Sequence, residues 1–383
     1  MERFEFATAN RIVFGPGTCA EVPSLIAPLG KRALFVTDSL ERSAWLRDAV
    51  QAVGVEVVLV CIEKEPDIDL VLLATQNLQQ SNCDLVIGFG GGSALDTAKA
   101  AAALAANPGD PLDYLEVVGK GQPLRFPSLP VIAIPTTAGT GSEVTRNAVI
   151  AVPERRVKVS LRSPFMLPRL AVVDPELTYS LPPALTASTG LDALTQCIEP
   201  FVCNTPNPLT DAICREGIRR AARSLRRACE DGLDRAARYD MCVASLCGGL
   251  ALANARLGAV HGLAGPIGGM FPAPHGAVCG RLLPEVVEMN VRVAQAQGHD
   301  ETLRRYEEVG QLVLGKAYQG LPSLTRWLHE IVEAMSLPRL AAYGIRPEDF
   351  PIIIAQAQKA SSMKGNPVPL YDNDLIDVLK NAC

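Results

Sequence analysis

Five short apolar runs, separated by segments of helical length, are the feature that most constrains how this chain can fold. The runs are nearly continuous and rich in β-branched residues, which is typical of parallel strands covered on both faces. They are Ala33–Thr37, Val55–Cys61, Asp84–Gly88, Val131–Pro135 and Leu170–Val173. The intervening helix-length segments are Glu41–Val53, Ile68–Gln80 and Ala94–Ala106. This alternation predicts right-handed βαβ units in the first half of the chain.

The sequence patterns before and after this α/β region differ from the pattern within it. Ahead of the first run, Glu5–Phe6 and Arg11–Phe14 flank a polar turn and predict a small hairpin. After Pro182, strand-like runs thin out and long Ala-, Leu- and Arg-rich segments with helical periodicity follow. A chain of 383 residues is long for one core. We therefore predict an α/β dinucleotide-binding domain of residues 1–181 and an all-α domain of residues 182–383.

Composition limits the kinds of binding partner and the cellular compartment that we expect for this protein. The 36 Lys and Arg residues against 41 Asp and Glu give a net charge of −5, with no basic excess that would suggest a nucleic acid partner. No segment approaches the roughly 20 uninterrupted apolar residues of a membrane helix, and the N-terminus carries charges where a signal peptide needs an apolar run. The 11 cysteines include no C-x-x-C pair, so we expect reduced, buried thiols and a cytoplasmic protein without membrane association.

Two polar, glycine-rich turns follow apolar runs of the first half. Gly90–Ser93 (GGGS) precedes the helix-length segment that carries Asp96 and Lys99, where backbone amides at a helix N-terminus favour an anion such as pyrophosphate. Thr136–Glu143 (TTAGTGSE) offers hydroxyls that suit a ribose, a phosphate or a carboxamide. A plain structural turn is the alternative for either one. Together, at the carboxyl ends of two strands, they predict a nucleotide bound in a crevice.

An acidic residue, Asp38, ends the first apolar run. A carboxylate at this point can accept hydrogen bonds from the adenosine ribose hydroxyls and repel a 2′-phosphate, which favours NAD over NADP. The alternative is an ordinary helix N-cap before Leu40 and Glu41.

Four polar residues of the second half form a candidate metal site. Asp192 and Gln196 are four apart and share one face of a helix, while His261 and His275 are two of only four histidines. A carboxylate and two imidazoles can hold a divalent cation and leave a position open for substrate. Taken singly, each has an alternative interpretation as a satisfied core histidine or a helix-cap aspartate. Cys279, four residues after His275, has the chemistry of a soft ligand, although packing is the favoured interpretation.

With these motifs the chain resembles the iron-containing (group III) alcohol dehydrogenase family over essentially its whole length. The motifs, in chain order, are FGPG at 14–17, GGGSALDTAK at 90–99, IPTTAGTGSEVT at 134–145, GLDALT at 190–195 and the segment with His261 and His275. The resemblance implies the architecture shared with dehydroquinate synthases, an active site in the cleft between the domains, and NAD(P)-dependent interconversion of small alcohols with aldehydes or ketones. It also implies a homodimer or larger homo-oligomer.

Individual residues follow from the same resemblance. It implies that Asp192, His261 and His275 are metal ligands, the two histidines also lining the reacting centre. The cofactor would be NAD, with Asp38 at the adenosine ribose and Lys158 near a ribose. The residues implied to contact the phosphates and the nicotinamide side are Gly91, Gly92, Ser93, Thr136 and Thr137.

The sequence departs from the family pattern at two positions of the active site. Where the family has its second helix ligand, a histidine, this chain has Gln196; where the family has a further histidine tied to proton relay, it has Gly265. A neutral amide oxygen is a poorer ligand than imidazole for Fe²⁺ or Zn²⁺, so we expect weaker metal binding with Gln196 in the fourth ligand position. Gly265 widens the pocket by one side chain and removes a titratable proton carrier.

Three functions are compatible with these residues. The leading hypothesis is hydride transfer between the nicotinamide C4 atom and a carbon held beside His261 and His275, with a divalent ion acting as Lewis acid. A metal-free reductase, like the maleylacetate reductases of the same superfamily, is favoured by the missing histidine and disfavoured by retention of Asp192 with both imidazoles. A non-catalytic nucleotide-binding protein would bind NADH without turning over any aldehyde.

Overall fold

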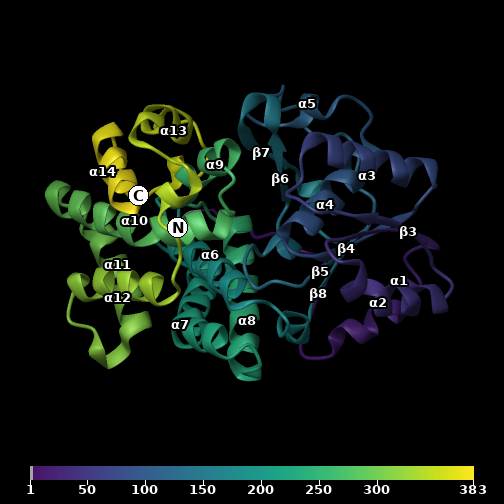
Figure 1. Ribbon diagram of the computed structural model, residues 1–383, viewed down its shortest axis with the longest axis horizontal. Helices are drawn as coiled ribbons and strands as arrows, with labels where there is room; N and C mark the ends of the chain where they lie inside the picture. Colours follow the sequence, from purple (N-terminus) through teal and green to yellow (C-terminus); the bar gives the residue numbers. More distant parts are fainter. Residues whose placement is uncertain (1–2) are drawn as a thin grey trace. The chain divides into compact units, whose positions relative to one another are not determined.

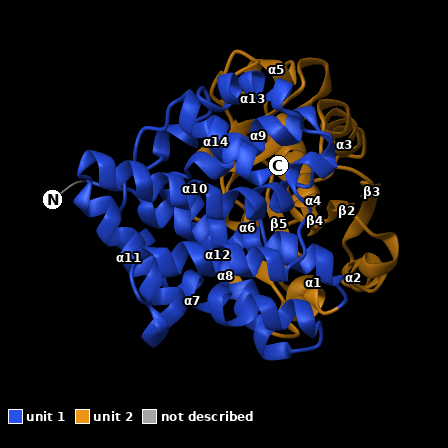
Figure 2. Ribbon diagram, turned by 60° about the vertical axis from the view of Figure 1, so that its left-hand side comes forward, with its two compact units in different colours: residues 1–6, 138–140, 180–383 blue, residues 7–137, 141–179 orange. Residues whose placement is uncertain are grey.

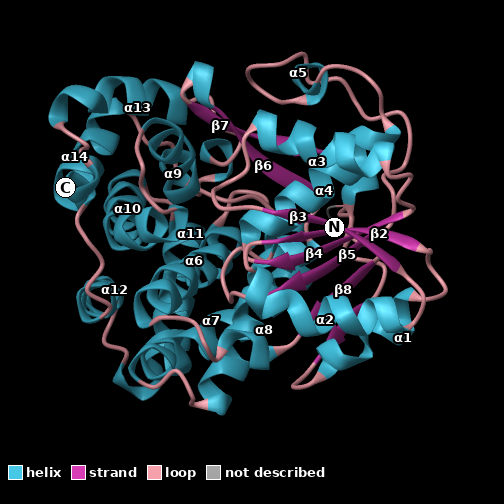
Figure 3. Cartoon of the chain, turned by 45° about the vertical axis from the view of Figure 1, so that its right-hand side comes forward, coloured by secondary structure: helices cyan, strands magenta, loops and turns pink. Residues whose placement is uncertain are grey.

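The computed structural model describes residues 3–383, which divide into two compact units (Figure 2). Of the described residues, unit 1 contains 3–6, 138–140 and 180–383, and unit 2 contains 7–137 and 141–179. Every strand of the described chain lies in unit 2, while the regular structure in the described part of unit 1 is helical (Figure 3). The predicted fold class, an α/β domain followed by an all-α domain, is confirmed.

Unit 2 is built on a six-stranded sheet in which all neighbouring strands are parallel, in the order β1-β8-β5-β4-β2-β3. The strands are β1 Ile12–Phe14, β2 Arg32–Thr37, β3 Glu56–Cys61, β4 Leu85–Gly90, β5 Val131–Pro135 and β8 Leu170–Val173. All five predicted runs are strands of this sheet. The register pairs Gly90 with Pro135, so the two glycine-rich turns leave the sheet from adjacent strand ends.

Helices cover both faces of the sheet, as the continuous apolar strands predict (Figure 1). The helices are α1 Val22–Ile26, α2 Leu40–Ala52, α3 Ile68–Gln80 and α4 Gly92–Ala106. Phe35 and Ile87 pack with α1 and α2, whereas Leu34 and Val86 pack with α3 and α4. Because side chains alternate along a strand, neighbouring residues of β2 and β4 supply two separate cores.

A second, two-stranded antiparallel sheet extends unit 2. It consists of β6 (Asn147–Val152) and β7 (Val157–Arg162), and its buried residues pack with Ala100, Ala103 and Leu104 of α4. A short helix, α5 (Pro111–Tyr114), lies in the long connection between α4 and β5. This sheet places Lys158 on β7.

The predicted N-terminal hairpin is wrong. Only Ile12–Phe14 forms a strand, and it pairs in parallel with Ala171–Val173 of β8 rather than with Glu5–Phe6. Two very short strands cannot sustain a hairpin by themselves, whereas the edge of an existing sheet offers a full set of backbone partners. Glu5 and Phe6 belong to unit 1 instead.

Unit 1 is a helical domain centred on α6 (Pro183–Val202), whose second half is buried throughout. The α6 helix packs against α7, α8 and α10. The other helices are α7 Pro208–Glu230, α8 Arg235–Asn254, α9 Ala259–Met270, α10 His275–Gln297, α11 Asp300–Leu314, α12 Leu321–Ala334, α13 Phe350–Ala357 and α14 Asp372–Ala382. A helix buried on every side can direct polar residues only at one another or at a ligand.

Within residues 3–383, no single helix combines the length and apolar character needed to cross a membrane. The pair α8 and α9 meets that test when joined, but the two helices are bent by 96° at the break between them.

Candidate functional site

The candidate metal site of unit 1 begins on one face of α6. Asp192, Gln196 and Glu199 follow one another at spacings of four and three residues, so they share that face. All three side chains are buried within an otherwise largely apolar helix. Buried polar groups at this depth need partners, which they find on α9 and α10.

Two further helices bring the histidines to this face. His261 lies in the first turn of α9, and His275 is the first residue of α10. The neighbouring Gly276 makes the approach of α10 close: a Cβ atom there would lie 2.4 Å from the Ser188 carbonyl oxygen and 3.4 Å from the Asp192 Cβ. A larger residue at 276 would push His275 away from the carboxylate.

The assembled site leaves one carboxylate oxygen without a hydrogen bond. Asp192 Oδ1 is buried and has no hydrogen-bond partner, although His261 Nε2 lies 3.4 Å away and His275 Nε2 lies 3.9 Å away. The two imidazole rings have centroids 5.5 Å apart. One carboxylate oxygen and two ring nitrogens therefore converge without satisfying one another, which is the arrangement expected around a cation site.

Glu199 completes the environment of His261 and was not identified from the sequence. Its Oε2 lies 2.6 Å from His261 Nδ1, and its Oε1 accepts a hydrogen bond of 2.7 Å from the Val260 backbone N–H. With Nδ1 occupied by a carboxylate, the Nε2 atom of His261 is left to face Asp192. The spacing of Glu199 from Asp192 and Gln196, on one face of an apolar helix, is the signal that could have revealed it.

Gln196 is oriented by its amide group. Its Nε2 donates to Asp192 Oδ2 at 2.9 Å and to the Gly139 carbonyl at 3.3 Å, while its Oε1 is buried without a hydrogen-bond partner. The side chain thus fixes Asp192 and still presents a free acceptor atom. Gly265, one turn after His261, has no heavy atom within 4 Å of where a Cβ would lie.

The ionisable groups perturb one another strongly. Cys279 Sγ lies 3.6 Å from His275 Nε2, and this contact is the main reason that the pKa of His275 rises to about 9. Burial lowers the pKa of His261, but Cys279, Glu199 and Asp192 together outweigh burial and raise it well above 6.5. Burial raises the pKa of Asp192, and the two imidazoles outweigh it and lower this pKa. The site therefore favours positive charge between its anionic groups.

These residues fit a divalent metal ion. The unpaired Asp192 oxygen, two imidazole nitrogens and the Cys279 sulfur supply donor atoms that all lie within 4.8 Å of one another. A cation would satisfy the unpaired oxygen and replace the protons that the site otherwise attracts. Nitrogen, oxygen and sulfur donors in this number suit Zn²⁺ or Fe²⁺ rather than Mg²⁺ or Ca²⁺.

The nucleotide turn of unit 2 is shaped by its backbone. Gly90 has a φ of +155°, and a Cβ there would lie 2.6 Å from Asp38 Oδ2, so only glycine fits this position. Gly91 caps α4 without a side chain, which leaves the helix N-terminus accessible to an anion. Thr136, the first residue of the adjacent turn, has a buried hydroxyl with no hydrogen-bond partner. An unpaired hydroxyl beside a glycine turn is compatible with a bound dinucleotide.

Two predicted cofactor residues have partners within the chain. Asp38 Oδ2 accepts a hydrogen bond of 2.8 Å from the Gly91 N–H, and the N-cap of α2 is Ser39, so the alternative of Asp38 as N-cap is wrong. Its carboxylate lies beside the turn, as a ribose ligand would. Lys158 forms an ion pair with Glu65.

The Asp96 and Lys99 side chains of the GGGSALDTAK motif hold the second turn in place. Lys99 is fully buried and its Nζ donates to the Ser142 carbonyl and the Thr145 hydroxyl, both at 3.0 Å, and to the Asn147 carbonyl. Asp96 lies 3.2 Å from the same Nζ and accepts a hydrogen bond of 2.5 Å from Ser142 Oγ. The GGGSALDTAK motif therefore stabilises the second turn, because the charged groups of Asp96 and Lys99 bind residues at its end.

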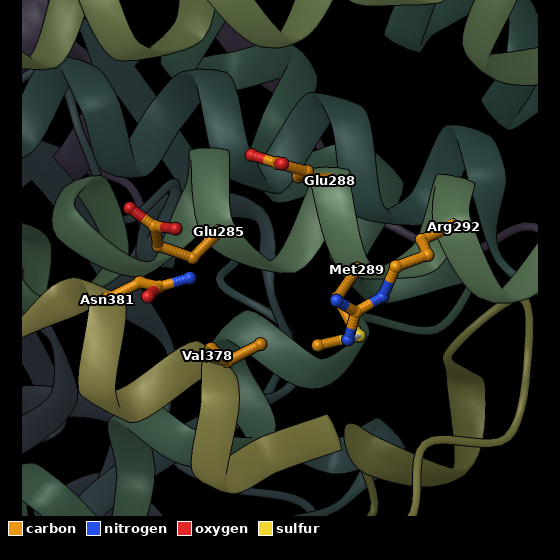
Figure 4. A pocket seen from close by; sticks show the side chains of 6 residues that line it. All are labelled: Glu285, Glu288, Met289, Arg292, Val378 and Asn381. Carbon is orange, nitrogen blue, oxygen red and sulfur yellow. Dashed lines mark hydrogen bonds between the residues drawn. The ribbon is translucent and has the colours of Figure 1, made fainter. Parts of the chain in front are cut away.

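A second group of metal-binding residue types lies at another point of α10. Glu285, Glu288 and His329 offer ligand atoms within 4.8 Å of one another, and Glu285 and Glu288 border a hollow with Met289, Arg292, Val378 and Asn381. Figure 4 shows the Glu285 side chain beside Asn381, whereas Glu288 points away from both Asn381 and Val378. Glu288 is 61% exposed and His329 is 41% exposed. Glu285 is buried, but the other two groups are open to solvent, and we assign this cluster no function.

Comparison with known proteins agrees with this arrangement. Residues 9–175 match the family model of the iron-containing alcohol dehydrogenases, and residues 186–383 match the model of that family's C-terminal domain. The chain is 38% identical over 376 residues to alcohol dehydrogenase 4 of Saccharomyces cerevisiae strain YJM789, covering 96% of both chains.

Solved structures also resemble it. A 1,3-propanediol oxidoreductase superimposes with a TM-score of 0.91 at 31% identity, with 100% of both chains covered. A sulfoacetaldehyde reductase from Bifidobacterium kashiwanohense, solved in complex with NAD⁺, superimposes with a TM-score of 0.87 at 27% identity, covering 99% of this chain and 98% of that one.

Proposed function

Because the chain belongs to the iron-containing alcohol dehydrogenase family, we propose that it is an NAD-dependent dehydrogenase that interconverts a small alcohol with its aldehyde or ketone. The observation that carries this proposal is the buried, unpaired Asp192 Oδ1 between the Nε2 atoms of His261 and His275. A buried carboxylate oxygen left unpaired costs stability, so its retention indicates a ligand.

We propose that Asp192, His261 and His275 hold a divalent ion, Fe²⁺ or Zn²⁺. When bound, such an ion supplies Lewis acidity that stabilises negative charge on a substrate oxygen. The protein's own contribution is orientation: Glu199 fixes the ring of His261 with Nε2 toward Asp192, and Gln196 fixes the other oxygen of Asp192. Both contacts hold the donor atoms before any substrate arrives, which lowers the reorganisation needed for reaction.

The cofactor would be held by the two turns of unit 2. NAD supplies the hydride chemistry when bound. We propose that the turn of Gly91, Gly92 and Ser93 at the start of α4 binds the pyrophosphate through the amides of Gly92 and Ser93, since the Gly91 N–H is donated to Asp38. The hydroxyls of Thr136 and Thr137 would bind the nicotinamide side. The residues proposed for the riboses are Asp38 and Lys158. The carboxylate of Asp38 would disfavour a 2′-phosphate and thus NADP.

Proton exchange differs from a histidine relay in this proposal. Gly265 contributes no side chain, and His261 Nδ1 is engaged by Glu199. The alcohol proton would therefore pass to water or to a ribose hydroxyl of the cofactor. We further propose a homodimer or larger homo-oligomer, which light scattering of the purified protein would check.

The test is metal analysis of protein purified without chelator, paired with NADH and NADPH oxidation on a panel of aldehydes before and after EDTA. We expect bound iron or zinc, a preference for NADH, and turnover that EDTA abolishes and the metal restores. Turnover that survives complete metal removal would identify a metal-free reductase instead. Tight NADH binding without turnover on any aldehyde would indicate a non-catalytic nucleotide-binding protein.

A further inference from the structure

We propose that Cys279 is a metal ligand in this chain, so that Asp192, His261, His275 and Cys279 form a four-donor set that selects Zn²⁺ over Fe²⁺. This inference rests on the proposed metal-assisted function and specifies the ligands and the ion at the same site. It assigns the fourth ligand position to the Cys279 thiolate, for which the sequence by itself favours packing, rather than to Gln196.

The separations of the donor atoms are compatible with a tetrahedral zinc site. Zn²⁺ with bonds of about 2.0 Å to nitrogen or oxygen and about 2.3 Å to sulfur places neighbouring donors roughly 3.3–3.5 Å apart. The Nε2 atom of His275 lies 3.6 Å from Cys279 Sγ and 3.9 Å from Asp192 Oδ1. The Nε2 atom of His261 lies 3.4 Å from the same Asp192 oxygen. Two of the three separations thus lie close to the expected values, and the third is longer by roughly half an ångström.

The position of Cys279 on its helix explains this geometry. His275 and Cys279 are four residues apart on α10, so both side chains point from one face of that helix toward α6. The thiol is fully buried and its polar neighbour is the ring nitrogen of His275. A contrast is provided by Cys197, which is equally buried but lies 3.5 Å from the Ala244 carbonyl and faces no imidazole.

Donor chemistry favours the sulfur over the amide. A thiolate is a soft anionic ligand that suits Zn²⁺, whereas the Gln196 oxygen is neutral and hard. A carboxylate and a thiolate together balance the charge of a divalent ion in a buried site, and the thiol proton leaves to solvent when the metal binds. With four protein donors, substrate would enter by expansion of the zinc site to five ligands, as occurs in some catalytic zinc sites.

The test is replacement of the native metal by Co²⁺ followed by absorption spectroscopy, because a thiolate bound to Co²⁺ gives a near-ultraviolet charge-transfer band that oxygen and nitrogen ligands do not. We expect this band in the unmodified protein and its loss in both Cys279→Ser and Cys279→Ala. Two matched cysteine controls, the buried Cys247→Ser and the exposed Cys61→Ser, should keep the band. Gln196→Ala should keep it as well. Circular dichroism confirms that each variant is folded.

Metal competition gives the second readout. We expect Cys279→Ser to lose about 10–100-fold in Zn²⁺ affinity with a much smaller change for Fe²⁺. Stoichiometric Co²⁺ without the sulfur band in the unmodified protein, or a band that persists in Cys279→Ser, would overturn the assignment. Dehydrogenase turnover is measured on the same samples: turnover without a sulfur band removes only Cys279 as ligand, whereas absence of both metal binding and turnover removes the proposed function too.

Discussion

Two buried polar clusters of this protein differ in how completely their charged groups are hydrogen-bonded. Around Lys99 in unit 2, the ammonium group is surrounded by two carbonyl oxygens, a hydroxyl and the Asp96 carboxylate. Around Asp192 in unit 1, the carboxylate oxygen Oδ1 and the Gln196 oxygen Oε1 are buried and have no hydrogen-bond partner. One cluster is complete within the chain and the other is not.

This difference in hydrogen bonding distinguishes a cluster that stabilises the fold from a cluster that can bind a ligand. A satisfied buried charge rigidifies the segment that surrounds it, and Lys99 does this for the turn that ends in Thr145 and Asn147. Unsatisfied buried acceptors destabilise a fold unless a ligand completes them. Both clusters arise from motifs of similar prominence in the sequence, so only their hydrogen bonding distinguishes a structural site from a binding site.

The largest expected effect comes from removing the structural charge. Lys99→Met removes the buried ammonium group that contacts Asp96 and the carbonyl oxygens of Ser142 and Asn147, so we expect a loss of about 3–5 kcal/mol in the free energy of unfolding, measured by denaturant titration. Lys120→Met, which removes an exposed ammonium paired with Asp113, is the control and should change little. Equal effects of the two variants would contradict the contrast between the clusters.

The next effect concerns Glu143, whose pKa is raised to about 7 by burial. Because the folded state holds this proton more tightly than the unfolded state, the stability that it contributes is present at low pH and is lost as pH rises from about 4.5 to about 7. The difference corresponds to roughly 3 kcal/mol. We expect Glu143→Gln to gain stability over the unmodified protein progressively between pH 5 and pH 8. Parallel stability curves for the two proteins across this range would contradict the assignment.

In unit 1 the expected effect is on metal binding rather than on folding. Glu199→Gln offers an amide N–H to His261 Nδ1, which drives the ring proton to Nε2 and blocks the nitrogen that faces Asp192. We expect Zn²⁺ affinity to fall about 10–100-fold, measured by competition with a chromophoric chelator. Glu288→Gln, an exposed change on α10, is the control. An unchanged affinity in Glu199→Gln would show that Glu199 does not orient the ligand.

The smallest effect tests the open space beside the same site. Gly265→Ala adds a methyl group that meets no atom within 4 Å, and alanine is favoured over glycine in a helix by about 1 kcal/mol. We expect a small rise in melting temperature. Gly262→Ala, in the same helix, places its methyl group 3.0 Å from Met363 Cε and should gain less or lose stability. A clear loss in Gly265→Ala would mean that this space is filled in the folded protein.

Much of the fold could be predicted because its signals are local. The apolar strand runs were located within a residue or two at most ends, and α3 matches the predicted segment Ile68–Gln80. The hairpin prediction failed because Ile12–Phe14 pairs with β8, a partner about 160 residues away in the chain. Strand pairing between distant segments depends on the assembled sheet and leaves no trace in the two short runs themselves.

The residues of the candidate site likewise include some that the sequence indicated and some that only the structure revealed. Asp192, Gln196, His261 and His275 could be proposed from residue type and spacing, and the structure brings all four together. Glu199 was hidden because a glutamate in a long helix usually faces solvent. Lys99 and Asp96 were recognised as parts of a nucleotide motif, but their task of holding the second turn was not.

The sequence alone determined the two-part architecture, the glycine turns and the chemical types of the candidate ligands, because periodicity and turn chemistry act between neighbours in the chain. The tertiary structure alone decided which buried polar atoms are satisfied. Asp192 Oδ1 meets the rings of His261 and His275 and, through His275, the sulfur of Cys279, because α6, α9 and α10 pack closely. That outcome depends on helix packing over almost 90 residues of sequence, which no local pattern encodes.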